Sequence, residues 1–421
     1  MNKMDLCTNT KNNFIILSFS FLIILLLWIF ISSGEYTKTF FFEDPEKCDT
    51  GMDFVNSVAD VTDGEAYTKY NTLYPPLANA GFYLINKTID HKNFELWFLY
   101  GRNSKYDLRL NKNMLLSLIM FSVISVLFLL LEIKSCLGNI NELFPFALTL
   151  NYGVLYALER GNSIIFVVAL VFYFCMNYDS DKLYKRELSL LCLAVAFGLK
   201  IYPAFFGVIL FKEKKYKMAI KAIIYGLIAF FVPFVFFGGF NGVIQFIDIF
   251  KNFSDGTSTV LNSYGISNIG NFICLGFETI IGKDLSVLRI VMIPILWLYT
   301  NLILLLSFLG EKQKWKWVLI ISLFVMFNQT SYDYTLTFMC IPFSFFIIVN
   351  QKINTNNIVY YICFCFLLLP YPSFSLSLSD RINMHTIITM IIILFASNKL
   401  FIDNFSSMKN IIISIHKRLN S

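Results

Sequence analysis

Lys200 is the side chain in this sequence whose type and surroundings most clearly call for a chemical explanation. It lies in the apolar stretch GLKIYPAFFGVILF (198–211), and Tyr202 and Pro203 follow it at once. A charged side chain at membrane depth is costly and therefore indicates function, although a lysine stem can also reach the interface from several residues' depth. Its position beside a helix break favours pairing of the ammonium with an anion such as a lipid-linked phosphate.

Carboxylates form the second candidate set. Eight of them open the polar segment 33–112, namely Glu43, Asp44, Glu46, Asp49, Asp53, Asp60, Asp63 and Glu65. A carboxylate held close to the bilayer surface could act as a general base. Most carboxylates in such a segment form a solvated acidic surface, so we expect only one or two of them to take part in chemistry.

Three further polar positions lie at expected turns. Glu159 and Arg160 precede Gly161 and Asn162, a combination that makes a good turn and also presents an arginine suited to phosphate or sugar. The stretch NSYGISNIGN (262–271) could bind sugar hydroxyls or be a simple polar loop. Asp333 begins an apolar run and could bind substrate or act as a favourable charge at a helix N-terminus.

The elements that must position these side chains are membrane-spanning helices. The 421 residues are 57% hydrophobic and 15% charged, and apolar runs of about 20 residues, enough to cross a bilayer as a helix, recur along the chain. The sequence therefore predicts an all-α polytopic membrane protein with a single integral membrane domain, residues 1–421. The expected spans are 14–32, 113–133, 142–158, 162–177, 217–238, 286–309, 315–330, 333–350, 357–371 and 383–400.

Charge predicts the orientation of these spans. Short basic loops at 179–187, 212–217 and 311–316 fall on the cytoplasmic side if the N-terminus does, as the positive-inside rule requires. The segments 33–112 and 239–285 then become the first and second extracytoplasmic loops. The first apolar run, with no clear cleavage site after it, is expected to be a retained anchor.

Residues 188–211 must then enter the membrane and return, because they lie between two basic loops on one side. Pro203 supplies the break, since proline lacks an N–H and disfavours helix in the residue before it. We expect two short helices, 188–199 and 203–211, with Lys200 at the turn between them. A broken helix at membrane depth requires packing in protein or a polar cavity.

The first extracytoplasmic loop is expected to carry short interfacial helices. The stretch after Pro75 and Pro76 is too short to cross a bilayer, and a proline pair suits the first turn of a helix. A second such helix is expected over residues 93–100, with Trp97 and Tyr100 as aromatic anchors. Cys48 is the single cysteine in this first loop, so no disulfide is expected there, and no metal site is apparent.

Several motifs, taken in order, resemble those of a known family. They are Asp53, GEAY (64–67), YPPL (74–77), RGN (160–162) and KIYP (200–203). The set resembles the polyprenyl-phosphate-mannose-dependent mannosyltransferases of the GT-C superfamily, in particular the bacterial alpha-1,2-mannosyltransferase family. The resemblance runs over about residues 14–345, with GLKIYPAFF as its best match. One departure is Ser57, in a stretch where the family usually has an aromatic residue after its aspartate.

The resemblance implies a GT-C-like bundle of about ten to twelve transmembrane or re-entrant helices, with a long first extracytoplasmic loop. It implies a metal-independent glycosyltransferase, multi-pass in a bacterial plasma membrane, with its active site on the extracytoplasmic side. The enzyme would transfer a hexose, mannose in the family, from a polyprenyl-phosphate sugar to a glycan or glycolipid acceptor. Its other partner is the lipid bilayer, and neither a cofactor nor nucleic acid is expected.

The resemblance also assigns roles to individual residues. Asp53 would be the catalytic base, and Lys200, Arg160 and Tyr202 would contact the donor phosphate. The expected substrate-binding residues are Tyr74 and Asn162 from these motifs, together with Asn262, Asn268 and Asp333 from the polar positions described above.

Two other functional classes stay open. An O-antigen or polysaccharide polymerase or ligase is also polytopic, but its large external loop usually comes late in the chain, whereas the first loop is the largest here. A lipid-linked sugar transporter would show internal repeats and buried charges in several spans. No repeat is found in this sequence, and its charges lie mainly at the ends of spans.

Overall fold

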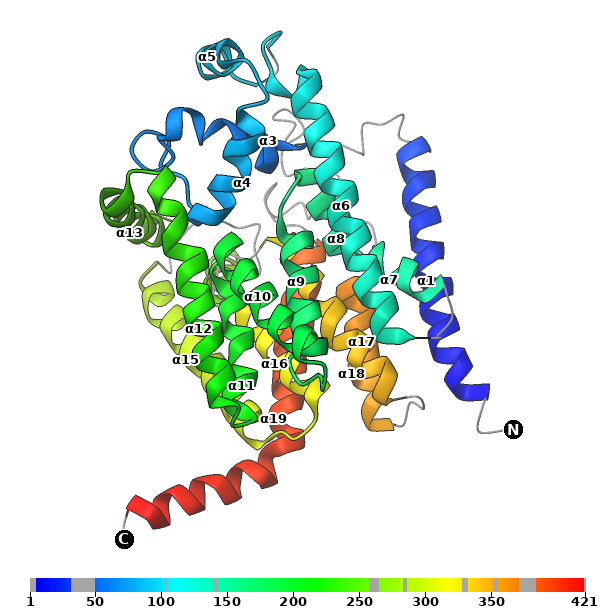
Figure 1. Cartoon of the computed structure of the whole chain (residues 1–421). Helices are drawn as coiled ribbons and strands as arrows, with labels where there is room; N and C mark the ends of the chain where they lie inside the picture. The colour runs from blue at the N-terminus through cyan, green and yellow to red at the C-terminus, as the bar shows by residue number, and fades with distance from the viewer. Residues whose placement is uncertain are drawn as a thin grey trace. The chain divides into compact units, whose positions relative to one another are not determined.

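The computed structural model describes residues 5–31, 50–102, 104–138, 143–256, 265–282, 286–327, 332–350, 355–370 and 384–419. All regular structure in these residues is helical, which confirms the predicted all-α class (Figure 1). The chain divides into two compact units. The first comprises residues 1–33, 136–153 and 258–421, and the second comprises 34–135 and 154–257.

The first unit is built from the two ends of the chain and a short central piece. Its helices are α1 (Asp5–Ile31), α7 (Leu143–Thr149), α14 (Ile266–Ile281), α15 (Ser286–Gly310), α16 (Lys314–Phe327), the 3₁₀ helix η5 (Asp333–Met339), α17 (Cys340–Val349), α18 (Thr355–Leu368) and α19 (Met384–Leu419). The predicted spans 14–32, 286–309, 315–330, 333–350, 357–371 and 383–400 are therefore helical over most of their described residues, and α19 continues well past the expected end at residue 400.

The second unit contains the long polar segment and the region around Lys200. Its helices are α3 (Met52–Ala59), η1 (Thr62–Gly64), α4 (Pro76–Asn86), α5 (His91–Tyr100), η2 (Leu108–Leu110), α6 (Lys112–Leu137), most of α8 (Tyr152–Arg160), α9 (Ile164–Asn177), α10 (Leu183–Leu199), η3 (Tyr202–Gly207), α11 (Val208–Lys212), α12 (Tyr216–Phe231), η4 (Val232–Phe236) and α13 (Gly239–Gly256). Helices α9, α10 and α12 pack side by side (Figure 1).

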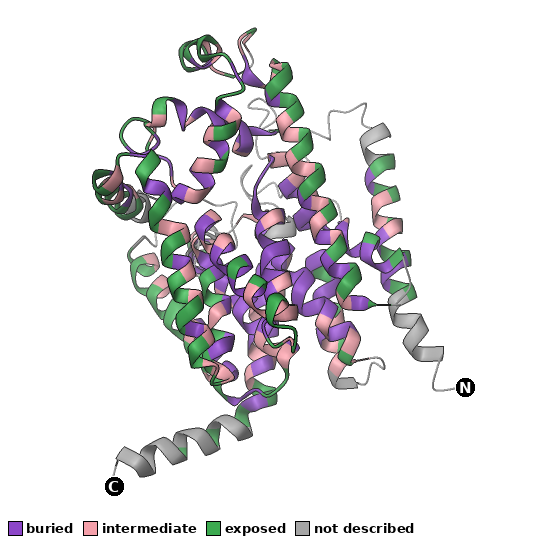
Figure 2. Cartoon of the chain, in the orientation of Figure 1, coloured by how far each residue is buried: buried purple, intermediate pink, exposed green. Residues whose placement is uncertain are grey.

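Four of the described helical segments are long and apolar enough to cross a bilayer. They are Lys112–Leu137, Tyr216–Phe236, Val287–Gly310 and Ile387–Phe405. Helices α6 and α12 turn large apolar side chains outward along much of their length, green in Figure 2, as helices that face lipid do. Leu116 on α6 and Ile228 on α12, for example, are each 53% exposed. The chain is accordingly a membrane protein.

The prediction of one continuous span over 142–158 is wrong. Helix α7 ends at Thr149 and α8 begins at Tyr152, so two short helices replace it. The side chain of Asn151 causes the break locally, because its Nδ2 donates a hydrogen bond to the Leu148 carbonyl at 2.7 Å, a local side-chain bond that competes with helix. Gly153 follows, where a Cβ would lie 2.6 Å from the backbone nitrogen of Thr337.

The predicted reversal at Lys200 is confirmed. Lys200 ends α10 with an extended backbone (φ −148°, ψ 139°), and Pro203 lies in the first turn of η3. The chain then returns to the end from which it came. Tyr178, after α9, donates its hydroxyl to Glu213, after α11, at 2.6 Å. The loops that flank residues 188–211 therefore lie at one end of the second unit.

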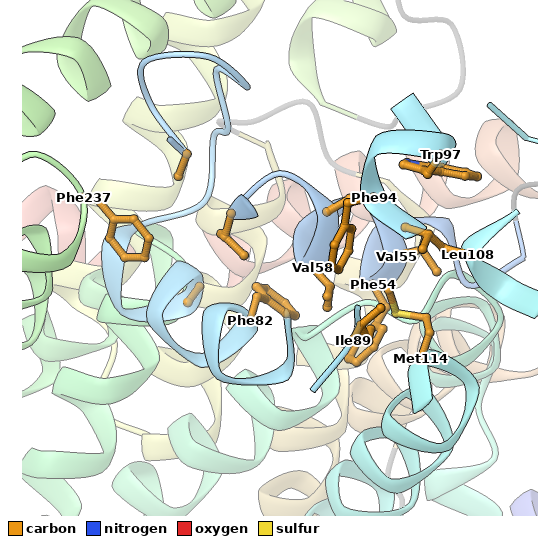
Figure 3. Packing of buried hydrophobic residues seen from close by; sticks show 14 of the residues in the cluster. Phe54, Val55, Val58, Phe82, Ile89, Phe94, Trp97, Leu108, Met114 and Phe237 are labelled. Atoms are coloured by element: carbon orange, nitrogen blue, oxygen red, sulfur yellow. The ribbon is translucent and has the colours of Figure 1, made fainter. Parts of the chain in front are cut away.

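The predicted loop helices form, and they share a core of their own (Figure 3). Pro75 and Pro76 start α4, while Asp90 caps α5 by accepting a hydrogen bond from the Lys92 amide at 3.1 Å. One detail of the prediction is wrong. Trp97 is only 7% exposed and packs in this core, because the small helices must bury apolar surface against one another. Tyr100 is 55% exposed.

Because the loops around residues 182 and 214 lie at one end of the second unit, we predict that they share one side of the membrane. Epitope tags inserted after residues 182 and 214 should both be protected from an impermeant antibody, whereas a tag after residue 90 should be reached from outside. Positive charge in short loops holds them inside. Labelling of intact cells at residue 214 but not at 182 would contradict the reversal.

Candidate functional site

The RGN sequence forms a sharp turn that is pressed against α3. Gly161 has a left-handed backbone (φ +66°), and a Cβ there would lie 2.8 Å from Leu118 Cδ1 and 2.9 Å from Phe54 Cβ. The amide of Gly51, before α3, donates a hydrogen bond to the Glu159 carbonyl at 2.7 Å. Only glycine fits this turn without strain, since it has no Cβ to clash and tolerates positive φ.

The turn places two donors around the carboxylate of Asp53. Arg160 donates from Nη2 and Nε to Asp53 Oδ1 at 2.7 and 3.2 Å, and Asn162 donates from Nδ2 to Oδ2 at 2.7 Å. Asn162 is itself fixed, because its Oδ1 accepts a hydrogen bond from the Ile164 amide at 3.0 Å. Asp53 lies in the first turn of α3, where the helix dipole also favours negative charge.

These contacts hold the Asp53 carboxylate in one orientation. Charge-assisted hydrogen bonds are the strongest kind, and the two arginine bonds also set the direction of the carboxylate. The side chains of Asp53 and Arg160 are 16% and 21% exposed, so water screens the pair only partly. Arg160, expected at the donor phosphate, has its guanidinium group on Asp53 in this structure.

Lys200 lies in the same site. Its ammonium is 4.9 Å from the centroid of the Tyr74 ring, a cation–π contact, and the residue is 8% exposed. Asp53 is near enough to act electrostatically on both Lys200 and Tyr74. The reversal in the membrane and the YPPL sequence of the loop thus bring a cation, a phenol and a carboxylate together.

The two motifs dock through a second contact. A Cβ on Gly198, the first residue of GLKIYP, would lie 2.6 Å from Cδ2 of Leu77, the last residue of YPPL. The glycine therefore lets α4 approach α10 closely, and the approach places Tyr74 against Lys200. Tyr202 completes the group, since it is 8% exposed and interacts electrostatically with Tyr74.

Tyr67 of the GEAY sequence fixes the backbone of Tyr74. Its hydroxyl donates to the Tyr74 carbonyl at 2.9 Å and accepts from Asn79 Nδ2 at 3.0 Å. Its ring packs against Phe234 and Phe246, with centroids 5.4 and 5.5 Å apart. Tyr67 thus acts on the site through Tyr74.

Ser57 and Asp60 take part in the site, although sequence reasoning gave neither a role. The Ser57 hydroxyl lies close enough to the Tyr74 phenol to lower its pKa, and it donates to the Asp53 carbonyl at 2.5 Å. Burial, and then the charge of Asp53, raise the pKa of Tyr74, so the phenol stays protonated at neutral pH. Burial also raises the pKa of Asp60 to about 7. The helical spacing of both residues from Asp53 was the available signal.

Three expected substrate residues belong to the other unit. Asp333, at the start of η5, is 5% exposed, and its Oδ2 accepts a hydrogen bond from Tyr152 at 2.9 Å. Asn268 lies in α14, and Asn262 lies outside the described residues, as does Cys48. No group of three metal-ligating side chains gathers anywhere in the described ranges.

A methyl group at residue 161 should loosen the hold on Asp53. Gly161→Ala is expected to cost about 1–3 kcal/mol of stability, because it combines positive φ with overlap on Leu118 and Phe54. Thermal unfolding in detergent measures the loss. Gly81→Ala is the matched control, since a Cβ on Gly81 meets nothing within 4 Å. Equal melting temperatures for the two variants would contradict the account of the turn.

Comparison with known proteins assigns the chain to a family. The family model described as Glycosyltransferase family 87 matches residues 108–328, more than half of the chain. No curated protein and no solved structure matches it. The matched segment includes Arg160, Asn162, Lys200 and Tyr202, whereas Asp53 and Tyr74 precede it. With the membrane helices and the polar site described above, the match shows that this chain belongs to glycosyltransferase family 87.

Proposed function

We propose that this protein is a GT-C-type membrane enzyme that transfers a hexose from a polyprenyl-phosphate sugar to a glycan or glycolipid acceptor. The proposed sugar is mannose, and the proposed site of reaction is the extracytoplasmic face of a bacterial plasma membrane. A glycosyltransferase requires a sugar donor and an acceptor, and family membership supports that much directly. The donor, the acceptor and the sidedness are proposals.

One observation carries the choice of donor. The ammonium of Lys200 lies at a helix break that follows an apolar helix, in the same site as the clamped carboxylate of Asp53. A lipid-linked phosphate at the membrane surface would bring its charge to such a cation while its chain stays in the bilayer. Tyr202, next to the break, would add a phenol to the phosphate contact.

Asp53 would act as the general base. Its three hydrogen bonds use both acceptor positions of Oδ1 and one of Oδ2, which leaves one lone pair on Oδ2 for an acceptor hydroxyl. The carboxylate would take the hydroxyl proton as the acceptor oxygen bonds to the anomeric carbon. Arg160 and Asn162 would be positioning residues in this step, because they aim the carboxylate.

The leaving group is the lipid phosphate. As the bond from the anomeric carbon to the phosphate oxygen breaks, the electron pair and negative charge stay on the phosphate, where Lys200 would neutralise them. Because the phosphate leaves a sugar that is already activated, a fixed ammonium could supply this stabilisation, and the proposed reaction is metal-independent. Tyr74 would hold Lys200 in place and line the site. Asn262, Asn268 and Asp333 belong to the other unit, and their role in substrate binding stays a prediction from the sequence.

The direct test uses membranes that contain the protein and radiolabelled polyprenyl-phosphate sugars, mannose first. Transfer of label to a glycan or glycolipid is expected, and membranes without the protein are the control. Movement of lipid-linked sugar across vesicles without a new glycosidic bond would instead identify a transporter. Growth of long chains from lipid-linked repeat units would identify a polymerase.

Loss of the base should stop transfer. Asp53→Asn is expected to lower kcat at least a hundredfold, since removal of a general base typically costs 10²–10⁴, while donor KM changes little. Asp63→Asn is the matched control, because Asp63 lies on the same loop, is 52% exposed and pairs with His91. Near-normal turnover by Asp53→Asn would remove Asp53 from the mechanism.

The charge of Lys200 should matter more than its stem. Lys200→Met keeps the length and apolar character but removes the ammonium, so donor use should fall severely with normal expression. Lys200→Arg should keep part of the activity, because the positive charge is retained but a planar guanidinium group replaces the compact ammonium group. Lys87→Met is the control: Lys87 lies over the Tyr83 ring at 4.7 Å but is exposed. A fully active Lys200→Met enzyme would reduce Lys200 to a residue that reaches for the interface.

A further inference from the structure

Asp60 shares a helix face with the proposed base. Asp60 is the C-cap residue of α3. It follows Asp53 by seven residues and Ser57 by three, a spacing that places the three side chains on one face of the helix. Seven residues of helix rise about 10.5 Å, which places Asp60 roughly two turns from Asp53. Both carboxylates act electrostatically on Tyr74, so each lies within electrostatic range of the phenol.

The carboxyl of Asp60 differs from two other partly buried or buried carboxylates in having no partner among the described residues. Asp53 is held by Arg160 and Asn162, and the buried Asp107 is held by Arg109 at 2.6 Å. Within the described part of the chain, the Asp60 carboxyl accepts no hydrogen bond and forms no ion pair, although the residue is half-buried at the C-terminal end of α3. A desolvated carboxyl with vacant acceptor positions destabilises the fold, and a bound hydroxyl group would satisfy it.

We propose that Asp60 is a sugar-binding residue of this enzyme, whose carboxylate accepts hydrogen bonds from ring hydroxyls of a sugar substrate. The inference rests on the proposed glycosyl transfer and adds a second carboxylate to it. Asp60 lies about two helical turns from Asp53, so it is too far away to contact the hydroxyl that Asp53 deprotonates. A hexose ring bound at the reaction centre also carries hydroxyls on the side away from Asp53, and Asp60 could accept hydrogen bonds from these. These hydroxyls belong either to the donor sugar or to the acceptor.

The surroundings of Asp60 determine how its role depends on pH. Helix α4, which packs against α3, carries no charged side chain from Pro76 to Asn86. The Tyr74 phenol lies within electrostatic range of Asp60, and Asp53, Arg160 and Lys200 act on the same phenol or contact its ring. Burial raises the pKa of Asp60 to about 7, so the carboxyl becomes protonated, and a weaker acceptor, as the pH falls below 7.

The test compares Asp60→Asn with Asp63→Asn, which removes the same charge from an exposed position on the same loop. With polyprenyl-phosphate mannose as donor and methyl α-mannoside as acceptor probe, Asp60→Asn should raise one KM about tenfold to a hundredfold, the usual effect of losing hydrogen bonds to a charged acceptor. A rise in donor KM places the hydroxyls on the donor, and a rise in acceptor KM places them on the acceptor. The affected KM of the unsubstituted enzyme should rise as the pH falls through 7, and this dependence should vanish in Asp60→Asn.

The same substitution should have the opposite effect on stability, because Asp60→Asn should stabilise the fold while it weakens substrate binding. Because the folded-state pKa is raised, Asp60 destabilises the fold increasingly as the pH rises from about 4 to about 7, and the cost is complete above 7. Asp60→Asn should therefore melt at a higher temperature than the unsubstituted protein at pH 8, and at nearly the same temperature at pH 4. Weakened substrate use together with increased stability would identify a residue retained for function.

Unchanged KM values for both substrates in Asp60→Asn would overturn the proposal, as would a loss of kcat alone. Failure of the proposed function looks different, because the unsubstituted protein would then transfer no sugar. In that case, binding is measured by thermal unfolding. We compare how much polyprenyl-phosphate mannose or methyl α-mannoside raises the melting temperature of Asp60→Asn and of Asp63→Asn. An equal rise for Asp60→Asn and Asp63→Asn, or none for either, would also overturn the role of Asp60.

Discussion

The ion pair between Asp53 and Arg160 is the constraint on which the polar site depends. It joins two segments more than one hundred residues apart in sequence, the start of α3 and the turn after α8. The pair forms because Gly161 allows the turn to approach α3 closely, and because Asn162 supplies a second donor. Each partner also satisfies a charge that would be costly to leave alone in a partly buried place.

Tyr74 is the second organising residue, and it connects the ion pair to Lys200. The Lys200 ammonium lies over its ring, Ser57 lies near its hydroxyl, and its backbone carbonyl accepts hydrogen bonds from Tyr67 and Asn79. The quadrupole of an aromatic face attracts a cation without neutralising it, so the positive charge stays available to an incoming anion. Transfer of a sugar from a phosphate leaving group needs a cation to stabilise the departing phosphate and a carboxylate to accept the proton of the acceptor, and this site holds both in fixed positions.

The short helices of the loop give this site a rigid support. Their shared core holds Phe54 of α3 against Phe82 of α4, with ring centroids 5.8 Å apart, and Trp97 of α5 packs into it (Figure 3). Asp53 therefore projects from a packed element, which favours a constant direction of the carboxylate. The same packing leaves Asp60 desolvated at the end of α3, a cost that the fold carries.

The sequence by itself determined the all-α membrane class, the reversal at Lys200 and the short helices after the proline pair. Apolar length, basic loops and proline chemistry are local properties, and each acts within a few residues of where it is read. Position and family resemblance singled out Asp53, Tyr74 and Lys200, and the structure brings these three residues near one another, while their roles stay predictions. The local reading missed the break between α7 and α8, because one amide side chain bonded to its own helix end decides that break.

Only the tertiary structure decided which partners these residues have. Arg160 binds Asp53, Leu77 packs on Gly198, and Ser57 reaches Tyr74, and each of these contacts joins segments that no sequence pattern relates. The burial of Trp97 and Asp60 was likewise invisible in the sequence, since exposure depends on what the rest of the chain brings near. Desolvation is a property of the assembled fold, and it distinguishes Asp60 from the exposed carboxylate of Asp63, which the sequence alone left equivalent to it.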